Sequence, residues 1–579
     1  MLDPYRFAVG MGIALLTAIV FLNGLGTFNT DIKPEIYWAP WRTAGSYLHA
    51  WISSPYLGSP NFNVGVVPVL LVTGVLRSIG LSPEWTFKVF HLGLWLIAAW
   101  GANRLLRELS PKVSRWSALA AGVLYLANPY TVQAGSTLAI ALPLAFLPWQ
   151  LLCFLRALRA ETRWGRWAWA GLFGLCFFAM SGMNAGVVPV LQLLALVPLI
   201  VFARWQWQIG WGRIAGTVLR CAVFVLGLSA YWLVPAISAS ATGASITAAS
   251  ETIDGIAKVS SYPEVLRGMG LWPLYGFDAD GAWIPQYSAY VTSPLIMLLT
   301  IVWPALALVS LRWSRGMARW FATGAVAIAA VVMVGAYPGS DPASPFGGLL
   351  ARVLGVPALS AFRTTNKVGA VLALAFALSL GAGAWVLVRR LRTLPVVAPA
   401  AGAGALALLT AWTLPAVTGN LYISPLDVPD YWITASAAAD SGAADSAVLM
   451  LPGQVSARYR WSTNRPDDLA NALFTRNVII PYTTPNASAP AANYLAALDD
   501  TLQSGTAPTD FVSSAARYLG VDKVLLRHDI DWQTDGGASP LQTAGTLDAD
   551  QGLTGEQNFG DPGSTSSRAP RTSMSRPRN

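Results

Sequence analysis

The chain has 579 residues, of which 54% are hydrophobic and only 12% are charged. A soluble core cannot bury that much apolar surface, so the composition excludes an ordinary soluble protein and indicates a multi-pass membrane protein. The formal net charge of +9 comes from Lys and Arg clusters between apolar stretches. Membrane topology explains such clusters, so we expect no nucleic acid among the partners of this protein.

Apolar stretches of roughly 17 to 25 residues, long enough to cross about 30 Å of hydrocarbon, recur from Phe7 to about Val417. The first of them runs to Leu25 without a small-residue cleavage pattern, so we expect a permanent span rather than a signal peptide. We predict about eleven full spans, near residues 7–25, 86–103, 116–128, 137–156, 167–183, 185–203, 215–236, 291–311, 320–337, 367–388 and 395–417.

The stretch at about 64–80 does not fit this series, because it and the span at 86–103 both lie between an outer loop and an inner cluster. Only one of the two can cross the membrane completely. The first is the shorter and contains Pro68 and Arg77, so we predict a re-entrant or interfacial helix packed against the outer face.

The Lys and Arg clusters between the spans give the orientation, because such clusters remain on the cytoplasmic side. The intervening loops, at about 26–63, 238–290 and 338–366, carry acidic residues and are predicted to face outward. The N-terminus is then cytoplasmic, and the C-terminus lies outside the plasma membrane. The basic clusters are Arg104, Arg107, Lys112 and Arg115; Arg156, Arg159, Arg163 and Arg166; Arg204 and Arg213; Arg312, Arg315 and Arg319; and Arg389, Arg390 and Arg392.

The composition changes after the last span, so we divide the chain into a transmembrane domain at 1–418 and an extracytoplasmic domain at 419–535. Predicted strands at 447–451 and 521–526 favour a small α/β fold for the second domain. From 536 to 579 the chain is rich in Gly, Ser, Thr, Pro and Asp and has few large apolar residues, so we expect disorder there.

The outer segment from Asn29 to Arg42, NTDIKPEIYWAPWR, places two carboxylates and two cations directly after the first span. Asp31 lies close to the membrane surface. A carboxylate there, beside aromatic rings, can deprotonate an acceptor hydroxyl as that hydroxyl attacks an activated sugar. The segment fits equally well an ordinary polar loop with Trp38 and Trp41 as interfacial anchors, and the residues alone leave both interpretations open.

Further short motifs follow this segment along the chain. They are Leu57–Gly58, Asn61–Gly65 (NFNVG), Asn128–Tyr130 (NPY), Ser260–Gly270 (SSYPEVLRGMG) with Trp272, Phe362–Lys367 (FRTTNK), Leu451–Gly453 (LPG) and Arg517–Arg527 (RYLGVDKVLLR). Together with TDIKPE at 30–35 and PWR at 40–42, they resemble the actinobacterial α-(1→3)-arabinofuranosyltransferases, which are membrane enzymes of the GT-C glycosyltransferase fold. The resemblance covers about residues 1–532.

The resemblance implies a fold and an activity. The fold is an α-helical multi-pass membrane protein of GT-C type, and the activity moves arabinofuranose from a polyprenyl-phosphate donor to a cell-wall arabinan outside the membrane. The acidic residue of the first outer loop is the expected general base, and here that residue is Asp31. Glu35 is the alternative base, one helical turn farther from the membrane if the loop is helical there.

The phosphate of such a donor becomes the leaving group, so the site needs cations at the outer membrane surface. Lys33, Arg363 and Lys367 are the main candidates, since the last two precede a span that begins near Val368. Contact with lipid headgroups remains an open alternative for these side chains. Arg42, Arg267 and Trp272 complete the predicted substrate-binding set.

Neither a P-loop nor a dinucleotide motif is present, which argues against a soluble nucleotide donor. The resemblance implies no cofactor beyond a lipid-linked sugar of the decaprenyl-phosphate-arabinose type, with membrane lipids as the remaining partners. We expect no metal site, because the pair Asp278 and Asp280 lacks a third close ligand. A polytopic transporter or flippase, or a non-catalytic envelope protein that binds glycan, is the alternative function; the scarcity of acidic residues within spans argues against a transporter.

Overall fold

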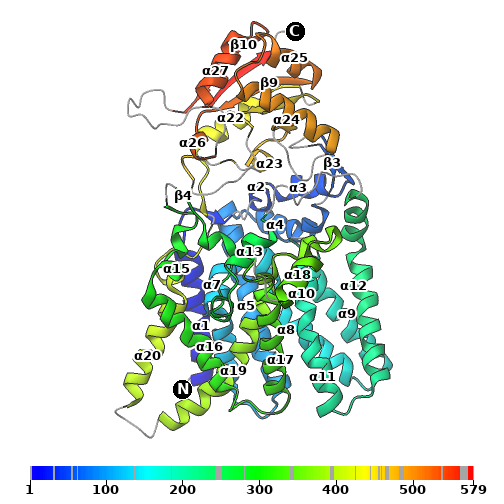
Figure 1. Ribbon diagram of the computed structural model, residues 1–579, viewed down its shortest axis with the longest axis vertical. Coiled ribbons are helices and arrows are strands. Elements are labelled where there is room, and N and C mark those ends of the chain that lie inside the picture. Colours follow the sequence, from blue (N-terminus) through cyan, green and yellow to red (C-terminus); the bar gives the residue numbers. More distant parts are fainter. Residues whose placement is uncertain are drawn as a thin grey trace. The chain divides into compact units, whose positions relative to one another are not determined.

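The computed structural model describes residues 3–29, 33–53, 57–61, 63–135, 137–183, 186–240, 251–278, 281–339, 345–391, 397–423, 425–443, 445–453, 457, 459–462, 469–481, 488–535, 539–560 and 572–577. The chain forms two compact units, each built from separate stretches of sequence (Figure 1). The helical unit consists of Met1–Leu25, Lys88–Tyr231 and Glu251–Ile423. The mixed unit consists of Gly26–Phe87, Trp232–Ser250 and Ser424–Asn579.

This division differs from the predicted transmembrane domain at 1–418, because residues 26–87 group with the C-terminal region. The physical reason is direct pairing between these stretches. Strand β1 (Phe28–Asn29) forms an antiparallel pair with β6 (Pro425–Leu426). In addition, helix α2 (Glu35–Trp38) packs against helix α23 (Leu469–Leu473).

The helical unit consists mainly of helices, since a helix satisfies its own backbone hydrogen bonds where water is absent. Helices α5 and α12 continue across the division between the units. The bounds are α1 (Pro4–Leu22), α5 (Pro83–Leu109), α6 (Arg115–Leu126), α7 (Pro129–Ala134), α8 (Leu138–Arg159), α9 (Arg163–Met180), α10 (Val187–Gln192), α11 (Leu196–Gln206), α12 (Trp211–Ser240), α13 (Ile253–Lys258), α14 (Tyr262–Leu266), α15 (Ala289–Thr292), α16 (Pro294–Ser310), α17 (Gly316–Val334), α18 (Pro345–Leu354), α19 (Gly369–Leu391), α20 (Val397–Trp412) and α21 (Leu414–Val417).

Seven helical stretches among the described residues are long and apolar enough to cross a membrane, so the chain is a multi-pass membrane protein. They are Pro4–Leu22, Pro83–Leu109, Leu138–Arg159, Val187–Gln206, Trp211–Ile237, Gly316–Val334 and Thr365–Arg390. The predicted spans at 116–128, 167–183, 291–311 and 395–417 are not among them. Their helices are shorter or less apolar: α6 has 12 residues, α16 has 17, α20 has 16, and α9 begins with Arg and Trp.

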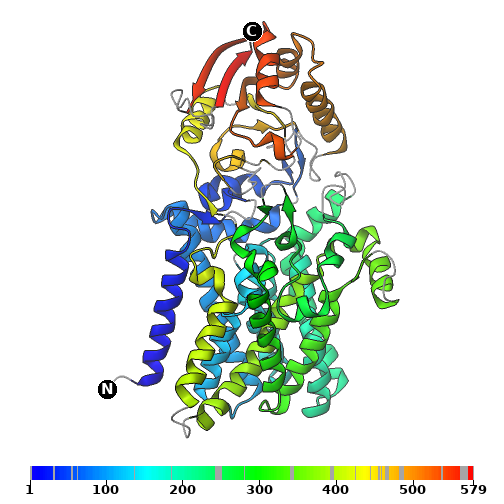
Figure 2. The same ribbon diagram turned by 60° about the vertical axis from the view of Figure 1, so that its left-hand side comes forward.

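The centre of the helical unit lies at α8 and α19. In α8 the apolar window is 89% buried, whereas in α1 only 6% is buried. Helix α8 packs against α9, and α19 packs against α6, α16 and α17. Trp303 of α16 meets Phe376 of α19 edge-on, with ring centroids 4.9 Å apart. Exposed apolar side chains such as Leu15 of α1, at the edge of the bundle in Figure 2, are then left to contact lipid.

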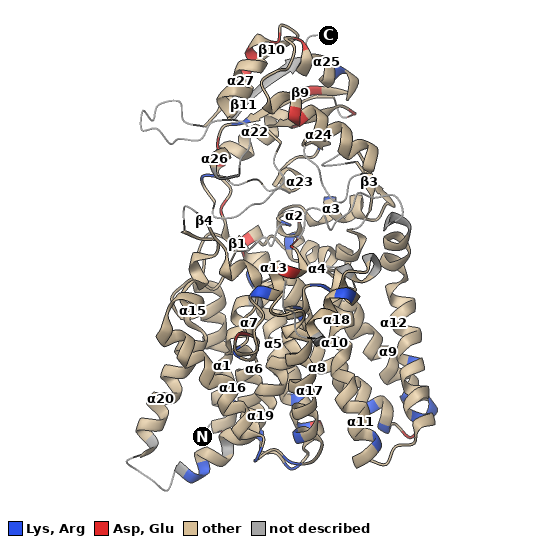
Figure 3. Cartoon of the chain, in the orientation of Figure 1, with Lys and Arg blue, Asp and Glu red and all other residues tan. Residues whose placement is uncertain are grey.

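Lys and Arg gather at one end of the helical unit, where α8, α9 and α11 begin or end (Figure 3). Two of them share one acidic partner, because Arg156 and Arg159 both pair with Glu108, at 3.1 and 3.2 Å. These are cluster residues that the sequence predicted to be cytoplasmic. Their gathering at one end of the bundle is the arrangement that the positive-inside rule requires.

The mixed unit contains a five-stranded sheet in the order β10-β11-β9-β7-β8. Strand β7 runs parallel to β8 and β9, while β11 runs antiparallel to both of its neighbours. Helices α22, α25 and α27 pack against the strands, and α24 packs against α27 (Figure 1). The bounds are α22 (Asp430–Asp440), β7 (Ala447–Leu451), β8 (Val478–Ile479), α24 (Ala489–Gln503), α25 (Phe511–Tyr518), β9 (Val521–Arg527), α26 (Trp532–Asp535), α27 (Pro540–Ala549), β10 (Leu553–Phe559) and β11 (Thr572–Pro577).

The predicted disorder of 536–579 differs from the structure at three elements, since α27, β10 and β11 all fall in this stretch. The low apolar content was the reason for the prediction, and β10 is indeed mostly exposed. Its order comes instead from backbone pairing: Met574 of β11 lies opposite Leu525 of β9 on one side and Gln557 of β10 on the other. Ladder hydrogen bonds of this kind need no apolar side chain.

A single buried carboxylate joins the sheet to α22. The Oδ2 atom of Asp529, just after β9, accepts hydrogen bonds from Tyr431 Oη, Trp432 Nε1 and Trp461 Nε1, each at 2.8 Å. Asp529 is fully buried. Three donors to this one oxygen offset part of the cost of burying the charge, although Oδ1 has no partner among the described residues.

A second carboxylate, Asp499 of α24, lies beside the LPG motif. Its Oδ1 accepts a hydrogen bond from Gly453 N at 3.2 Å, and its Oδ2 accepts one from Gln503 Nε2 at 2.6 Å. Burial raises the pKa of Asp499 from its ordinary value of 3.8 to about 6, and the two hydrogen bonds only partly oppose that rise. In the folded protein this carboxyl therefore keeps its proton up to about pH 6, higher than an exposed aspartic acid does.

We predict that Asp499 makes the stability of α24 depend on pH. Between pH 3.8 and about 6 the folded form keeps the proton that the unfolded form releases, so stability falls as the pH rises through this window. Hydrogen exchange of α24, corrected for intrinsic rates, should show a loss on the order of 2 kcal/mol. Asp499→Asn should remove this pH dependence, whereas the exposed Asp548→Asn control should retain it. A flat wild-type profile would contradict the prediction.

Candidate functional site

The first outer segment forms α2 and, directly after it, α3 (Pro40–Tyr47) in the mixed unit. Asp31, the predicted general base, lies outside the described residues. Lys33 is described, and its Nζ donates a hydrogen bond to Asn63 Oδ1 at 3.1 Å. Asn63 belongs to the NFNVG motif. The structure therefore brings the TDIKPE and NFNVG motifs into direct contact.

Glu35, the alternative base, is the first residue of α2 and is fully buried. Its Oε1 accepts a hydrogen bond from Tyr47 Oη of α3 at 3.1 Å. A general base must reach the hydroxyl that it deprotonates. Because this carboxylate has no exposed surface, the geometry favours a structural role for Glu35, which links α2 to α3.

Arg42 of α3 contacts the C-terminal part of the mixed unit. Its Nη2 donates to the carbonyl oxygens of Asn471 and Ala472, at 2.9 and 2.7 Å. Burial lowers the pKa of Arg42, while the carboxylates of Asp440 and Glu35 act in the opposite direction. The side chain stays charged at neutral pH, because an arginine titrates far above that range.

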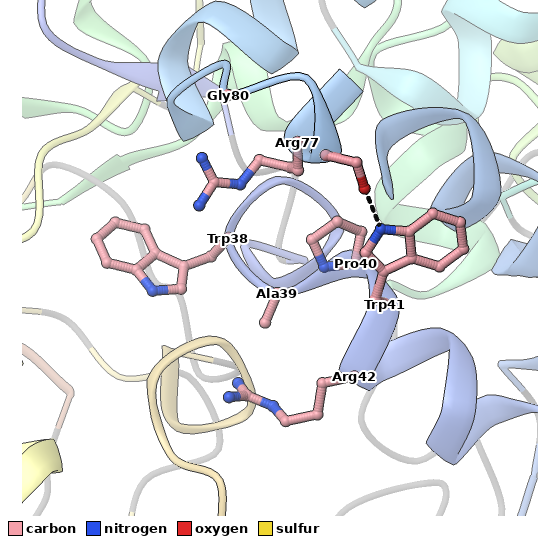
Figure 4. A pocket seen from close by; sticks show the side chains of 8 residues that line it. Trp38, Ala39, Pro40, Trp41, Arg42, Arg77 and Gly80 are labelled. Carbon is pink, nitrogen blue, oxygen red and sulfur yellow. Dashed lines mark hydrogen bonds between the residues drawn. The ribbon is translucent and has the colours of Figure 1, made fainter. Parts of the chain in front are cut away.

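A pocket of about 440 Å³ opens beside Arg42, between α3 and the end of helix α4 (Val67–Ser78). In Figure 4 the Arg77 side chain lies above Ala39 and the Arg42 side chain lies below it, with Trp38 at the left. Trp41 Nε1 donates to Ser78 Oγ at 2.8 Å. The lining residues are Trp38, Ala39, Pro40, Trp41, Arg42, Arg77, Ser78 and Gly80.

Close packing holds Trp41 in this position. A Cβ atom at Gly74 of α4 would lie 2.7 Å from the Trp41 ring, so the indole rests directly on the helix backbone. Helix α4 covers roughly 18 Å with its 12 residues, which is too short to cross the hydrocarbon. This length suits the predicted re-entrant or interfacial helix.

In the helical unit, the FRTTNK motif meets the loop that precedes α13. Arg363 Nε donates to the backbone oxygen of Glu251 at 2.8 Å, and Arg363 Nη2 lies 3.8 Å from Glu251 Oε2. Thr364 Oγ1 donates to Glu251 Oε1 at 2.6 Å. We call Glu251, Arg363 and Thr364 the Arg363 cluster. Its ion pair is only partly exposed, at 10% for Arg363 and 22% for Glu251.

Two buried side chains hold the backbone that follows, the 3-10 turn Thr365–Val368. Tyr130 Oη donates to the oxygen of Asn366 at 3.2 Å, and Gln192 Nε2 donates to the oxygen of Lys367 at 2.8 Å. Tyr130 comes from the NPY motif, so this second pair of motifs is also in contact. The backbone carrying the predicted cation Lys367 is thus fixed from two helices.

We predict that Gly369→Ala disrupts this arrangement. A Cβ atom at Gly369 would lie 2.0 Å from the Tyr130 ring, so the variant must displace the side chain that holds the turn. Thermal or chemical denaturation in detergent should show a loss of roughly 1–3 kcal/mol. Gly402→Ala on α20 is the matched control, because nothing lies within 4 Å of its added Cβ. Equal stability of the two variants would contradict the prediction.

Arg267, another predicted substrate contact, is 1% exposed. Its Nε and Nη2 bond the Glu264 carboxylate at 2.9 and 2.8 Å, its Nη1 bonds Thr300 Oγ1 at 3.0 Å, and its Nη2 also bonds the oxygen of Tyr290 at 2.8 Å. Every guanidinium nitrogen is therefore used inside the protein, and the geometry favours a structural role.

Trp272, the predicted aromatic contact, lies edge-on to Trp283, with ring centroids 6.0 Å apart. Trp283 is 46% exposed. Trp272 itself is half-buried. The pair leaves part of its aromatic surface open, and the substrate-binding role of Trp272 remains a prediction.

We predict a measurable coupling between Glu251 and Arg363. Single and double replacements, Glu251→Gln and Arg363→Gln, should give an interaction energy of roughly 0.5–1 kcal/mol in unfolding free energy. Glutamine keeps the acceptor for Thr364, so the cycle isolates the charge pair. Glu108→Gln combined with Arg363→Gln should be additive, since Glu108 pairs with other arginines. Additivity in the first cycle would contradict the assignment.

The predicted site residues thus fall into two groups. Lys33, Glu35 and Arg42 belong to the mixed unit, whereas Arg267, Trp272, Arg363 and Lys367 belong to the helical unit. Sequence reasoning missed Glu251 as the partner of Arg363 and missed Gln192, for which no motif gave a signal. Within the described parts of the chain, no three His, Cys, Asp or Glu side chains gather as a metal site.

Comparisons with known proteins give the fold and the family. The model of the family described as "Alpha-(1->3)-arabinofuranosyltransferase, N-terminal GT-C domain" matches residues 15–578. The α-(1→3)-arabinofuranosyltransferases of Mycobacterium tuberculosis and Mycolicibacterium smegmatis are 23% and 24% identical over 95% of this chain. The chain spans about 40% of the length of these curated relatives. The cryo-EM structure of arabinofuranosyltransferase AftD from Mycobacteria superposes with a TM-score of 0.70 and 19% identity, over 99% of this chain and 40% of that one.

The fold is therefore that of the GT-C membrane glycosyltransferases. Within that class, the chain belongs to the α-(1→3)-arabinofuranosyltransferase family, because the family model covers nearly all of its length.

Proposed function

We propose that this chain is a membrane glycosyltransferase that moves arabinofuranose from a polyprenyl-phosphate donor to a cell-wall arabinan on the outer face of the plasma membrane. The observation that carries the proposal is the family match along residues 15–578. Membrane-spanning helices suit a donor with a hydrocarbon tail. The predicted cations are supported by position, since Arg363 and Lys367 stand directly before the apolar helix α19.

The proposed chemistry assigns one role to each group. Asp31 takes the proton from the acceptor hydroxyl, and the oxygen forms the new bond to the anomeric carbon of arabinose. The bond between that carbon and the phosphate oxygen breaks, and the lipid phosphate leaves with the electron pair. Lys33, Arg363 and Lys367 stabilise the charge that develops there. No cofactor is needed, since the phosphoester already activates the sugar.

In the proposed topology the N-terminus lies in the cytoplasm and the chain crosses the membrane about eleven times. The basic residues at the ends of α5 and α8 both lie on the cytoplasmic side in this topology. Helix α8 crosses back to that side, so the chain must first cross outward between α5 and α8. Helices α6 and α7, separated at Asn128, supply that crossing together. Helices α9, α16 and α20, of 18, 17 and 16 residues, approach the hydrocarbon thickness and supply the others.

The test is a transfer assay with the purified chain, a synthetic decaprenyl-phosphate arabinose donor and an arabinan oligosaccharide acceptor. Asp31→Asn should lower the rate by roughly 10²–10⁴ at unchanged stability, because it removes the proton acceptor. Asp427→Asn replaces an exposed carboxylate in the same unit and should keep the wild-type rate. A fully active Asp31→Asn variant would remove Asp31 from the role of base. Acceptor binding without any turnover by the wild type would favour a non-catalytic glycan-binding protein.

A further inference from the structure

Helix α14 of the helical unit carries a carboxylate to which the proposed transfer chemistry assigns no role. Glu264 accepts hydrogen bonds from Arg267 at both of its oxygens, with Nε to Oε1 at 2.9 Å and Nη2 to Oε2 at 2.8 Å. Tyr275 Oη donates a further hydrogen bond to Oε2. Arg267 is itself fixed by Thr300 Oγ1 and by the backbone oxygen of Tyr290. A buried cation and a phenol therefore hold this carboxylate in one orientation.

One edge of the Glu264 carboxylate has room for an outside donor. Oε1 accepts one hydrogen bond from the described residues, whereas a carboxylate oxygen has lone pairs for two. The Glu264 side chain is 19% exposed, while Arg267 is only 1% exposed. Solvent therefore reaches the glutamate and not the arginine of this ion pair. The accessible group is a hydrogen-bond acceptor, which suits a hydroxyl group and disfavours a phosphate.

The 3-10 turn Trp272–Tyr275 connects this carboxylate to an aromatic surface. Side chains three residues apart in such a turn lie on the same side of it, so Trp272 and Tyr275 project together. Tyr275 reaches Glu264 from that side. Leu274 of the same turn is buried instead. The turn therefore places an indole and a carboxylate on one surface of the outer loop.

Trp283 extends this surface. Its ring lies edge-on to Trp272, with centroids 6.0 Å apart. A Cβ atom at Gly276 would lie 2.2 Å from the Trp283 ring, so one side of the indole rests on the backbone. The Trp283 side chain is nevertheless 46% exposed. An indole that is fixed on one side and open on the other offers contact area to a ligand at a low cost in conformational entropy.

We propose that Glu264, Trp272 and Trp283 form a binding subsite for a sugar unit of the arabinan chain, an assignment that rests on the proposed function. The C–H groups of a sugar ring pack on the open indole surface, whose π-face is negative. A hydroxyl group of the same sugar donates to Glu264 Oε1. Two tryptophans that only anchor the protein at the membrane surface would account for the rings. They would not account for a carboxylate held beside them by a buried arginine.

The test is isothermal titration calorimetry of a synthetic arabinan oligosaccharide into the purified full chain in detergent, with no sugar donor present. Trp283→Ala should raise the Kd by about tenfold, because it removes the open ring. Trp283→Phe should recover part of that loss. Trp320→Ala is the matched control, since Trp320 of α17 is also 46% exposed, and it should bind as the wild type does.

The carboxylate is tested by replacing both members of the ion pair, because removing Glu264 alone would leave Arg267 buried without a counter-charge. Glu264→Leu combined with Arg267→Met should raise the Kd by about tenfold, with folding checked by thermal denaturation. An O-methylated oligosaccharide tests the same contact without a change in the protein. It keeps the sugar rings but cannot donate, so its binding to the wild type should be weaker by about the same factor.

The outcomes separate this subsite from the proposed function. Unchanged affinity in Trp283→Ala, or no saturable binding by the wild type, would overturn the subsite even if the wild type transfers arabinose. Displacement of the oligosaccharide by inorganic phosphate would also overturn it, in favour of an anion site. Binding that Trp283→Ala weakens, in a wild-type chain that transfers no arabinose, would uphold the subsite and remove the transfer activity.

Discussion

Inside hydrocarbon a peptide group has no water to bond, and the helical unit is arranged around this constraint. At two breaks between helices, polar side chains bond the backbone groups that the helix leaves unpaired. Asn128 Nδ2 bonds the oxygens of Leu124 and Tyr125 at the break between α6 and α7. Tyr130 and Gln192 do the same for the turn that follows the Arg363 cluster. The positions of Arg363 and Lys367 therefore depend on side chains that touch no substrate.

In the mixed unit the main constraint is different, because several charged side chains are buried away from water. Fixed partners offset the cost of this burial at several charges, as three aromatic donors do for Oδ2 of Asp529. Arg42 follows the same rule through Nη2, which bonds the carbonyl oxygens of Asn471 and Ala472.

The sequence predicted the parts of the fold that rest on regular patterns. Apolar stretches predicted the long helices, and the predicted strands at 447–451 and 521–526 correspond to β7 and β9. Discontinuous contacts left no such signal. Nothing in the sequence around Arg42 indicates that it bonds Asn471, and nothing around Glu251 indicates Arg363. The pairing of β10 and β11 could not be predicted from the sequence either, because the hydrogen bonds between strands join backbone groups and do not depend on side-chain polarity.

The mixed unit is assembled from both ends of the chain, and that has a consequence for biogenesis. Arg42 and the carbonyl it bonds are separated by 429 positions. At ribosomal speeds of about 5–20 residues per second, Arg42 is synthesised roughly 20 to 90 s before Asn471. During that interval α2 and α3 have left the ribosome while α23 does not yet exist. A chaperone or a lipid surface that covers the apolar side of α4 would protect the incomplete chain from aggregation during this interval.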